Sequence, residues 1–147
     1  MIDTQIEREV VIHAPLEVVW RTITQPDQIS QWFAECTELE LKPGGRGVLL
    51  MEGHPDPIVV QVVEPPNHFS FRWNQPAGQE PGPGNSMLVE FMLVAEGDQT
   101  RLRVVESGHE LHDWPASDKT RYAEEHREGW GTFLDRLTTL LAERGAE

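Results

Sequence analysis

The last third of the chain carries the pattern that most restricts how it can fold. Between Ser117 and residue 144 there is no proline, and large, mostly apolar side chains recur every three or four residues. At about 100° per residue they share one face of an α-helix, opposite a charged face, so a long amphipathic helix is predicted over residues 117–144. Such a helix, about 40 Å long at 1.5 Å per residue, must pack against an equally long apolar surface. Its predicted apolar face consists of Tyr122, His126, Trp130, Phe133, Leu134, Leu137, Leu140 and Leu141.

The chain before this helix is rich in short strand patterns. Phe69, Phe71 and Trp73 alternate with polar residues, which is the period of two of a strand with one buried face. Short connections between consecutive strands favour antiparallel pairing. The sequence therefore predicts an antiparallel sheet whose apolar face is covered by the C-terminal helix. Its strands are expected at residues 6–12, 36–41, 48–52, 58–64, 69–73, 86–95 and 100–106.

Two short helices are predicted between the first and second strands. Pro15 and Pro26 each stand where a helix favours proline at its first position, and apolar residues follow at helical spacing. At the other end of the chain, Ser117 is expected to cap the long helix. The predicted fold class is α+β, a curved antiparallel sheet wrapped around a long C-terminal helix. At 147 residues the chain fits one domain, residues 1–147.

The charge balance restricts the possible partners. The chain has 12 Lys and Arg against 25 Asp and Glu, a formal net charge of −13. Nucleic acid and anionic membrane surfaces are bound by clustered Lys and Arg, which this acidic sequence lacks, so neither partner is expected. We also find no signal peptide and no apolar run of the roughly 20 residues that span a bilayer. Because Cys36 is the single cysteine and cannot form an internal disulfide, we expect a cytoplasmic protein.

Short motifs occur in a fixed order along nearly the whole chain. They lie at residues 10–15, 18–20, 29–33, 44–46, 62–66, 71–73, 100–102, 106–108 and 129–130. Together they resemble the START-like, helix-grip superfamily SRPBCC, and within it the group similar to the C-terminal domain of the heat-shock ATPase activator Aha. The resemblance implies an apolar cavity between the sheet and the last helix. It does not single out a function, because such folds serve ligand carriers, cyclases, hydrolases and co-chaperones.

The aromatic residues predict the walls of that cavity. Large rings can hold walls apart and suit flat apolar ligands. The alternative is that the same rings fill the core at ordinary packing density. The predicted apolar lining is Trp32, Phe33, Phe71, Trp73, Phe91, Val104, Trp130 and Phe133, and the predicted polar site residues are Glu106, His109 and His126.

His126 is the first candidate for polar chemistry, because it lies in the middle of the apolar helix face. A buried imidazole needs a hydrogen-bond partner, and Glu106 or Tyr122 could supply it. His126 could then bind a polar group of a ligand or act as a general base; the alternative is a satisfied core histidine.

Other motifs do not predict a metal, cofactor or nucleophile site. Residues 109–113, His-Glu-Leu-His-Asp, are one residue short of the zinc motif HExxH. No GxSxG surrounds a serine, and the glycine-rich residues 44–47 lack the Lys-Ser/Thr of a phosphate loop. We therefore predict neither a metal nor a cofactor.

Two further features concern packing and partners. Leu88, Met92 and Val94 lie on the outer face of a predicted strand, so a homodimer or a chaperone contact is possible there unless a loop covers them. Gly129 and Gly131 each cost about 1 kcal/mol against alanine within a helix. Close packing of a neighbouring segment is the favoured explanation, and room for a ligand is the alternative.

Three functional hypotheses follow. The leading one is non-catalytic binding of an apolar or aromatic small molecule under the last helix, because no strong catalytic motif is present. The second is a co-chaperone-like protein-interaction domain. The third is a cyclase- or hydrolase-type enzyme that uses Glu106, His109 or His126 as acid or base, which requires at least two of them to converge.

Overall fold

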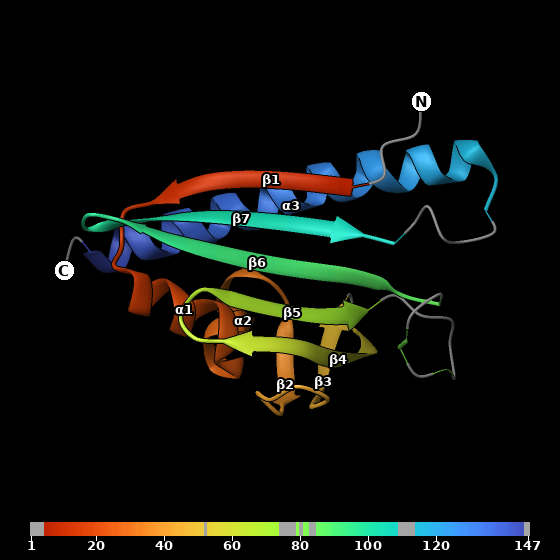
Figure 1. Cartoon of the computed structure of the whole chain (residues 1–147), viewed down its shortest axis with the longest axis horizontal. Helices are drawn as coiled ribbons and strands as arrows, with labels where there is room; N and C mark the ends of the chain where they lie inside the picture. The colour runs from red at the N-terminus through yellow and green to blue at the C-terminus, as the bar shows by residue number, and fades with distance from the viewer. Residues whose placement is uncertain are drawn as a thin grey trace.

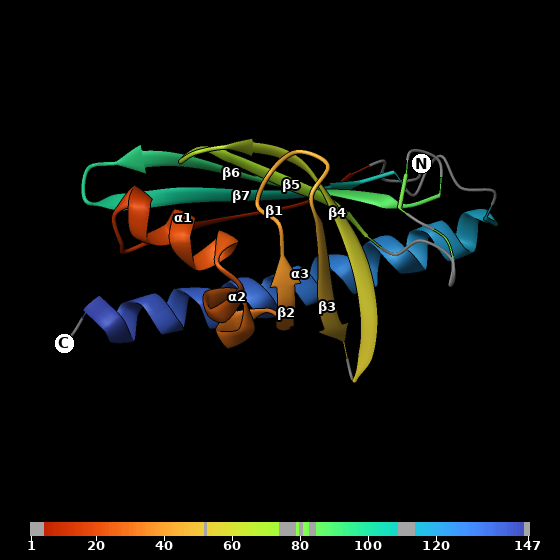
Figure 2. The ribbon, with the colours of Figure 1, turned by 90° about the horizontal axis from the view of Figure 1, so that it is seen from below.

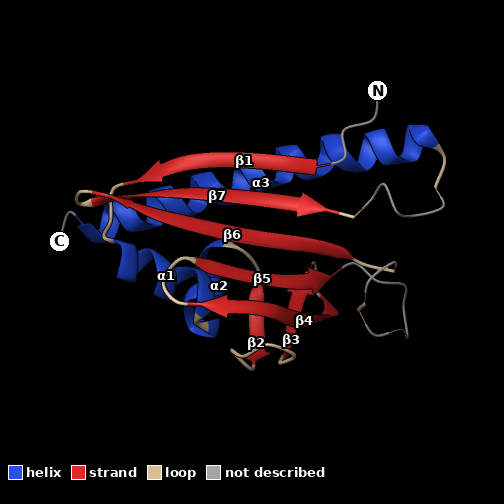
Figure 3. Ribbon diagram, in the orientation of Figure 1, coloured by secondary structure: helices blue, strands red, loops and turns tan. Residues whose placement is uncertain are grey.

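A computed structural model describes residues 5–51, 53–73, 79, 81–82, 85–108 and 114–145. This part of the chain forms a seven-stranded antiparallel sheet and three helices (Figures 1 and 3). The helices are α1 (Leu16–Thr24), α2 (Pro26–Trp32) and α3 (Ala116–Gly145). The strands are β1 (Gln5–Ile12), β2 (Glu35–Leu39), β3 (Arg46–Met51), β4 (His54–Glu64), β5 (His68–Trp73), β6 (Met87–Glu96) and β7 (Gln99–Ser107).

The strand order is β1-β7-β6-β5-β4-β3-β2, so consecutive strands from β2 to β7 are neighbours and the first strand closes onto the last. Figure 2 shows α3 running along one side of the curled sheet, with α1 and α2 on that same side. The predicted α+β helix-grip architecture, with two short helices after the first strand, is thereby confirmed. None of the described helices is long and apolar enough to cross a membrane.

Two predicted boundaries are wrong. β4 begins at His54, four residues before the predicted start, because residues 54–57 pair with β3 although two of them are prolines, which strands usually exclude. α3 begins at Ala116: the Pro115 carbonyl accepts the backbone N–H groups of residues 118 and 119, at 3.0 and 3.1 Å. Ser117 therefore lies inside the first turn and does not cap the helix. The other boundaries differ by one or two residues.

The core lies between the concave face of the sheet and α3. Along β6 the residues that alternate with the predicted outer face, Met87, Val89, Phe91 and Leu93, are all buried. The predicted stripe on α3 faces the same core, with Trp130, Leu134, Leu137 and Leu141 buried and Tyr122, His126, Phe133 and Leu140 partly buried. The predicted amphipathic packing of α3 is therefore confirmed. On the outer face, Val94 is 57% exposed.

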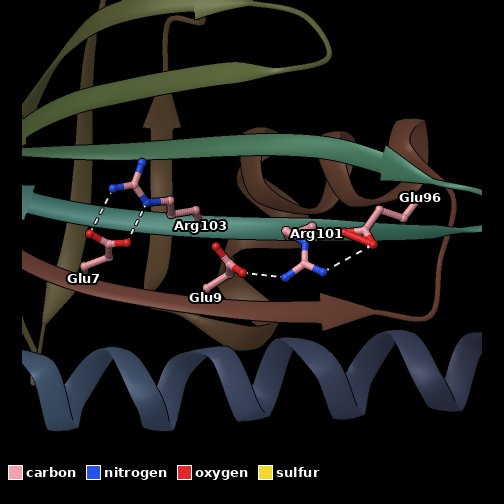
Figure 4. A network of polar contacts seen from close by, with 5 residues as sticks. All are labelled: Glu7, Glu9, Glu96, Arg101 and Arg103. Carbon is pink, nitrogen blue, oxygen red and sulfur yellow. Dashed lines mark hydrogen bonds and ion pairs between the residues drawn. The ribbon is translucent and has the colours of Figure 1, made fainter.

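The outer face of the sheet carries a row of ion pairs across β1, β7 and β6 (Figure 4). Arg103 donates to both carboxylate oxygens of Glu7, at 2.7 and 2.9 Å, and this lowers the pKa of Glu7. Arg101 bridges Glu9 and Glu96. Since these pairs are solvent-exposed, we assign them a role in keeping this face hydrated rather than a large share of the stability.

Candidate functional site

Aromatic side chains from α2, β5 and α3 converge around the ring of Phe33. The ring centroid of Phe33 lies 5.3 Å from Trp32, 5.3 Å from Trp130 and 4.8 Å from Phe133. Trp73 is the fourth neighbour, at 5.6 Å. We call these four side chains, Trp32, Trp73, Trp130 and Phe133, the aromatic box. All of them were predicted as site residues, and the tertiary structure brings them together around one ring.

Beside the aromatic box lies a small apolar cavity of about 10 Å³. This is about the space of a single water molecule, so the rings nearly fill the interior in this structure. Four predicted residues, Trp32, Phe33, Phe71 and Phe91, line it, whereas Val104 is buried elsewhere in the core. The prediction missed the other lining residues, which are Ile23, Ile29, Cys36, Leu39, Leu49, Ile58 and Phe69. Burial raises the pKa of the Cys36 thiol in this wall.

A fully buried carboxylate, Glu106, lies next to the aromatic box. Its Oε1 accepts hydrogen bonds from His126 Nδ1 at 2.8 Å and from Trp130 Nε1 at 2.9 Å. Its Oε2 accepts from Tyr122 Oη at 2.6 Å and from Trp73 Nε1 at 2.9 Å. Four donors satisfy the roughly four lone-pair positions of a carboxylate. The predicted partnership of His126 with Glu106 is confirmed, and Tyr122 shares the same carboxylate.

These donors hold Glu106 in its charged form. Burial acts to raise the pKa of Glu106, but the hydrogen bond from His126, the positive charge of that ring when it is protonated, and the hydrogen bonds from Tyr122 and Trp130 outweigh it and bring the pKa below its ordinary value. A buried carboxylate that is ionised and fully hydrogen-bonded fixes the orientation of every group that donates to it.

Local sequence patterns explain why these residues meet. Glu106 follows Leu102 and Val104 on the inward face of β7, where the period of two places a charged residue in an apolar row. Tyr122, His126 and Trp130 are spaced by four, so they share one face of α3. In Figure 1 the ends of β5 and β7 and the beginning of α3 lie at the same end of the molecule.

The ring of His126 has one engaged and one free nitrogen within the described part of the chain. Nδ1 meets Glu106, and no described residue hydrogen-bonds to Nε2. The side chain is 24% exposed and stacks on Tyr122 with a centroid distance of 3.8 Å. Its other ring contact is with Trp73, edge-on at 6.1 Å. His126 thus connects the buried carboxylate to the surface.

The two glycines of α3 differ in their surroundings. A Cβ on Gly131 would lie 3.1 Å from the Arg8 guanidinium, whereas a Cβ on Gly129 would meet nothing within 4 Å. The predicted close packing is confirmed for Gly131 and is wrong for Gly129. The remaining predicted site residue, His109, and the near-HExxH segment lie outside the described residues. Within the described part, no group of three His, Cys, Asp or Glu side chains could hold a metal ion.

The curled sheet, the long C-terminal helix and the short helices after the first strand define a START-like, helix-grip domain. Residues 13–142 match the family described as "Activator of Hsp90 ATPase homolog 1-like protein". The chain therefore belongs to this family, as the resemblance of its motifs implied. No curated protein matches the sequence.

Several solved structures are similar to this chain. Protein MLL2253 from Mesorhizobium loti is 27% identical, with a TM-score of 0.78 and coverage of 95% of this chain and 97% of that one. DynU16, "a putative protein in the dynemicin biosynthetic locus", is 26% identical with a TM-score of 0.76; the match covers 95% of this chain but 48% of DynU16. The Aha1 dimer from Colwellia psychrerythraea is 19% identical, with a TM-score of 0.73 and coverage of 95% and 96%, and shows the shared fold alone.

Proposed function

We propose that this chain binds a flat, apolar, ring-containing small molecule inside the aromatic box, at the position where the ring of Phe33 lies. The contacts of Phe33 carry the proposal. Its ring has stacked, tilted and edge-on neighbours at 4.8–5.6 Å, which is the arrangement in which a protein holds one aromatic ring. The ring also forms part of the wall of the apolar cavity.

The backbone at Phe33 supports displacement of its ring. α2 ends at Trp32 and β2 begins at Glu35, so Phe33 belongs to the short connection between them. Its φ of −109° and ψ of −82° are neither helical nor extended. The ring can therefore be moved by changes in the connection, without breaking the sheet.

The energetics indicate which ligands can do this. Burial of a phenylalanine side chain contributes about 1.5–3 kcal/mol, and a ligand that displaces Phe33 must replace that contribution. A fused two-ring compound offers more apolar area than the phenyl ring and can also use the adjacent cavity. We therefore expect bicyclic compounds to bind more tightly than benzene or toluene.

The comparisons are consistent with a small-molecule role. DynU16 is described as belonging to a biosynthetic locus, a setting that suits a protein that handles small molecules. The family name and the exposed Val94 keep the co-chaperone-like hypothesis as a second candidate. Homodimerisation through Leu88, Met92 and Val94, and a cytoplasmic location, also remain proposals.

The test is a titration with 2-methylnaphthalene followed by the indole N–H signals in ¹H–¹⁵N NMR spectra. Trp32, Trp73 and Trp130 form three sides of the aromatic box, so their signals should shift together and saturate. Phe33→Ala should bind the probe at least tenfold more tightly, because the resident ring no longer competes and the cavity left behind is apolar. Leu93→Ala is the matched control, since Leu93 is also a buried apolar side chain but contributes to neither the box nor the cavity.

The fold of both variants, Phe33→Ala and Leu93→Ala, is verified before their affinities are compared. Truncation of a buried ring costs about 3–5 kcal/mol of stability, and truncation of a buried leucine costs about 2–5 kcal/mol. A wild-type protein whose indole signals do not respond to any bicyclic probe, together with a Phe33→Ala variant that gains no affinity, would refute the proposed function. Equal gains in Phe33→Ala and Leu93→Ala would show that any core cavity suffices and that the box is not the site.

A further inference from the structure

We infer that His126 is the polar recognition group of this site and that it accepts a hydrogen bond at Nε2 from a weakly acidic O–H of the ligand. The preferred ligand class is then a hydroxylated aromatic compound, such as a phenol or naphthol. Glu106 acts as the positioning residue for His126. The inference rests on the proposed function, because it assumes that the aromatic box receives a ring.

The first step of the argument is the tautomer of the neutral imidazole. The Glu106 carboxylate only accepts hydrogen bonds while it is ionised, so the Nδ1 that it contacts at 2.8 Å must carry the proton. In the neutral ring the lone pair is then on Nε2. A carboxylate that fixes one imidazole nitrogen in this way leaves the other as an oriented acceptor.

The second step is the orientation of the ring. The two nitrogens of an imidazole point in divergent directions, so Nε2 faces away from the buried carboxylate. Stacking on Tyr122 at 3.8 Å and an edge contact with Trp73 hold the plane of the ring. Tyr122 is itself held by its hydrogen bond to Glu106 at 2.6 Å. The acceptor is therefore preorganised, which lowers the entropy that binding must overcome.

The third step relates this acceptor to the aromatic box through a side chain that touches both. Trp73 contacts both the ring of Phe33, at 5.6 Å, and the ring of His126, at 6.1 Å. Because Trp73 is a wall of the box and also donates to Glu106, the polar and apolar parts of the site share one side chain. An apolar pocket with a few convergent polar groups is the usual composition of a small-molecule site.

A second histidine of the chain provides a contrast and a control. His68 is on the outer face of the sheet with a side-chain exposure of 27%, close to that of His126. Its two nitrogens face carboxylates on both sides, Glu64 at 3.3 Å and Glu90 at 3.2 Å. Neither nitrogen is left as a free acceptor, so His68 is not expected to bind an aromatic hydroxyl.

The experiment compares two probes of the same ring system, 2-naphthol and 2-methylnaphthalene, by the same NMR titration. A net hydrogen bond of about 0.5–1.5 kcal/mol corresponds to a preference of roughly two- to tenfold, so wild-type protein should bind 2-naphthol more tightly by that factor. His126→Phe should bind both probes with equal affinity, and His68→Phe should retain the wild-type preference. Because His126→Phe also removes a donor to Glu106, its fold is first checked by circular dichroism.

A direct measurement covers the case in which that variant does not fold. In wild-type protein labelled with ¹⁵N in the histidine ring, the Nε2 signal of His126 should shift on addition of 2-naphthol and stay in place with 2-methylnaphthalene. Equal affinity of the wild type for both probes, or an Nε2 signal of His126 that does not shift with 2-naphthol, refutes this inference while the proposed function stands. Failure of both probes to bind refutes the two together.

Discussion

Replacing Glu106 by glutamine should destabilise the protein even though the two side chains have the same shape. In the wild type each carboxylate oxygen accepts one indole N–H, from Trp130 at Oε1 and from Trp73 at Oε2. An indole can only donate, and an amide has one oxygen and one NH₂ group. Whichever way the glutamine turns, one indole N–H faces an NH₂ group and loses its acceptor.

The size of the effect follows from this count. A buried donor without a partner costs about 1–3 kcal/mol, and the remaining hydrogen bonds also lose the strength that the carboxylate charge gave them. Tyr122 and His126 can adapt, because a hydroxyl can accept and an imidazole can change tautomer. We therefore expect Glu106→Gln to lower the free energy of unfolding by about 2–4 kcal/mol.

A double-mutant cycle separates this reason from a general loss of packing. Trp73→Phe removes one of the two indole donors. In that background the glutamine can turn its NH₂ group toward the phenylalanine at position 73, and no indole N–H is left without an acceptor. The cost of Glu106→Gln should then fall by about 1–3 kcal/mol.

The measurement is urea unfolding followed by circular dichroism at 222 nm, which avoids the changed tryptophan signal. The slope of the unfolding free energy against urea concentration is compared between variants, because an unchanged slope shows that only the stability has changed. Costs that add within about 0.5 kcal/mol would refute the argument from indole donors. So would a Glu106→Gln protein as stable as the wild type.

Three further predictions concern other side chains. Burial acts to raise the pKa of Glu106, but His126 and the other donors lower it below the ordinary 4.5. The stabilisation by its ionised form is therefore complete above that pH and is lost as the pH falls further. The gap in unfolding free energy between wild type and Glu106→Gln should accordingly narrow as the pH falls below 4.5; a gap that widens over that acid range would contradict this. Gly129→Ala should raise the free energy of unfolding by up to about 1 kcal/mol, because its Cβ meets open space. Gly131→Ala should raise it less, or lower it, because its Cβ approaches Arg8. Thermal unfolding of the pair tests this, and equal shifts would show that the contact does not matter. Burial raises the pKa of Cys36, so a disulfide reagent at about pH 8 should label this thiol only slowly until urea is added; fast labelling of the folded protein would place the thiol at the surface.

Much of the fold was predictable because its signals are periodic and local. The stripe on α3 repeats every three to four residues, and the rings of β5 repeat every two, and each period corresponds to one backbone geometry. The start of β4 was predicted wrongly because Pro55 and Pro57 argue against a strand in isolation, whereas β3 offers them a pairing partner. A boundary decided by a neighbouring strand cannot be read from the residues on either side of it.

The polar part of the site was also partly predictable. Glu106 interrupts an inward-facing row of apolar residues, and His126 interrupts an apolar helix face, so each needed a buried partner and each was the natural partner of the other. The signal that was missed is that Trp73 and Trp130 bring an indole N–H to the same place. Their roles as rings were predicted, but their role as donors depends on the register between β5, β7 and α3.

Sequence by itself determined the order and type of the helices and strands, which faces are apolar and where charge interrupts them, because these properties depend on neighbours along the chain. Tertiary structure alone decided that Phe33 lies inside the aromatic box, that the adjacent cavity is only about 10 Å³, and that four donors meet one carboxylate. The physical reason is that packing depends on how α2 and α3 approach the sheet to within the size of a side chain. No local pattern encodes that distance.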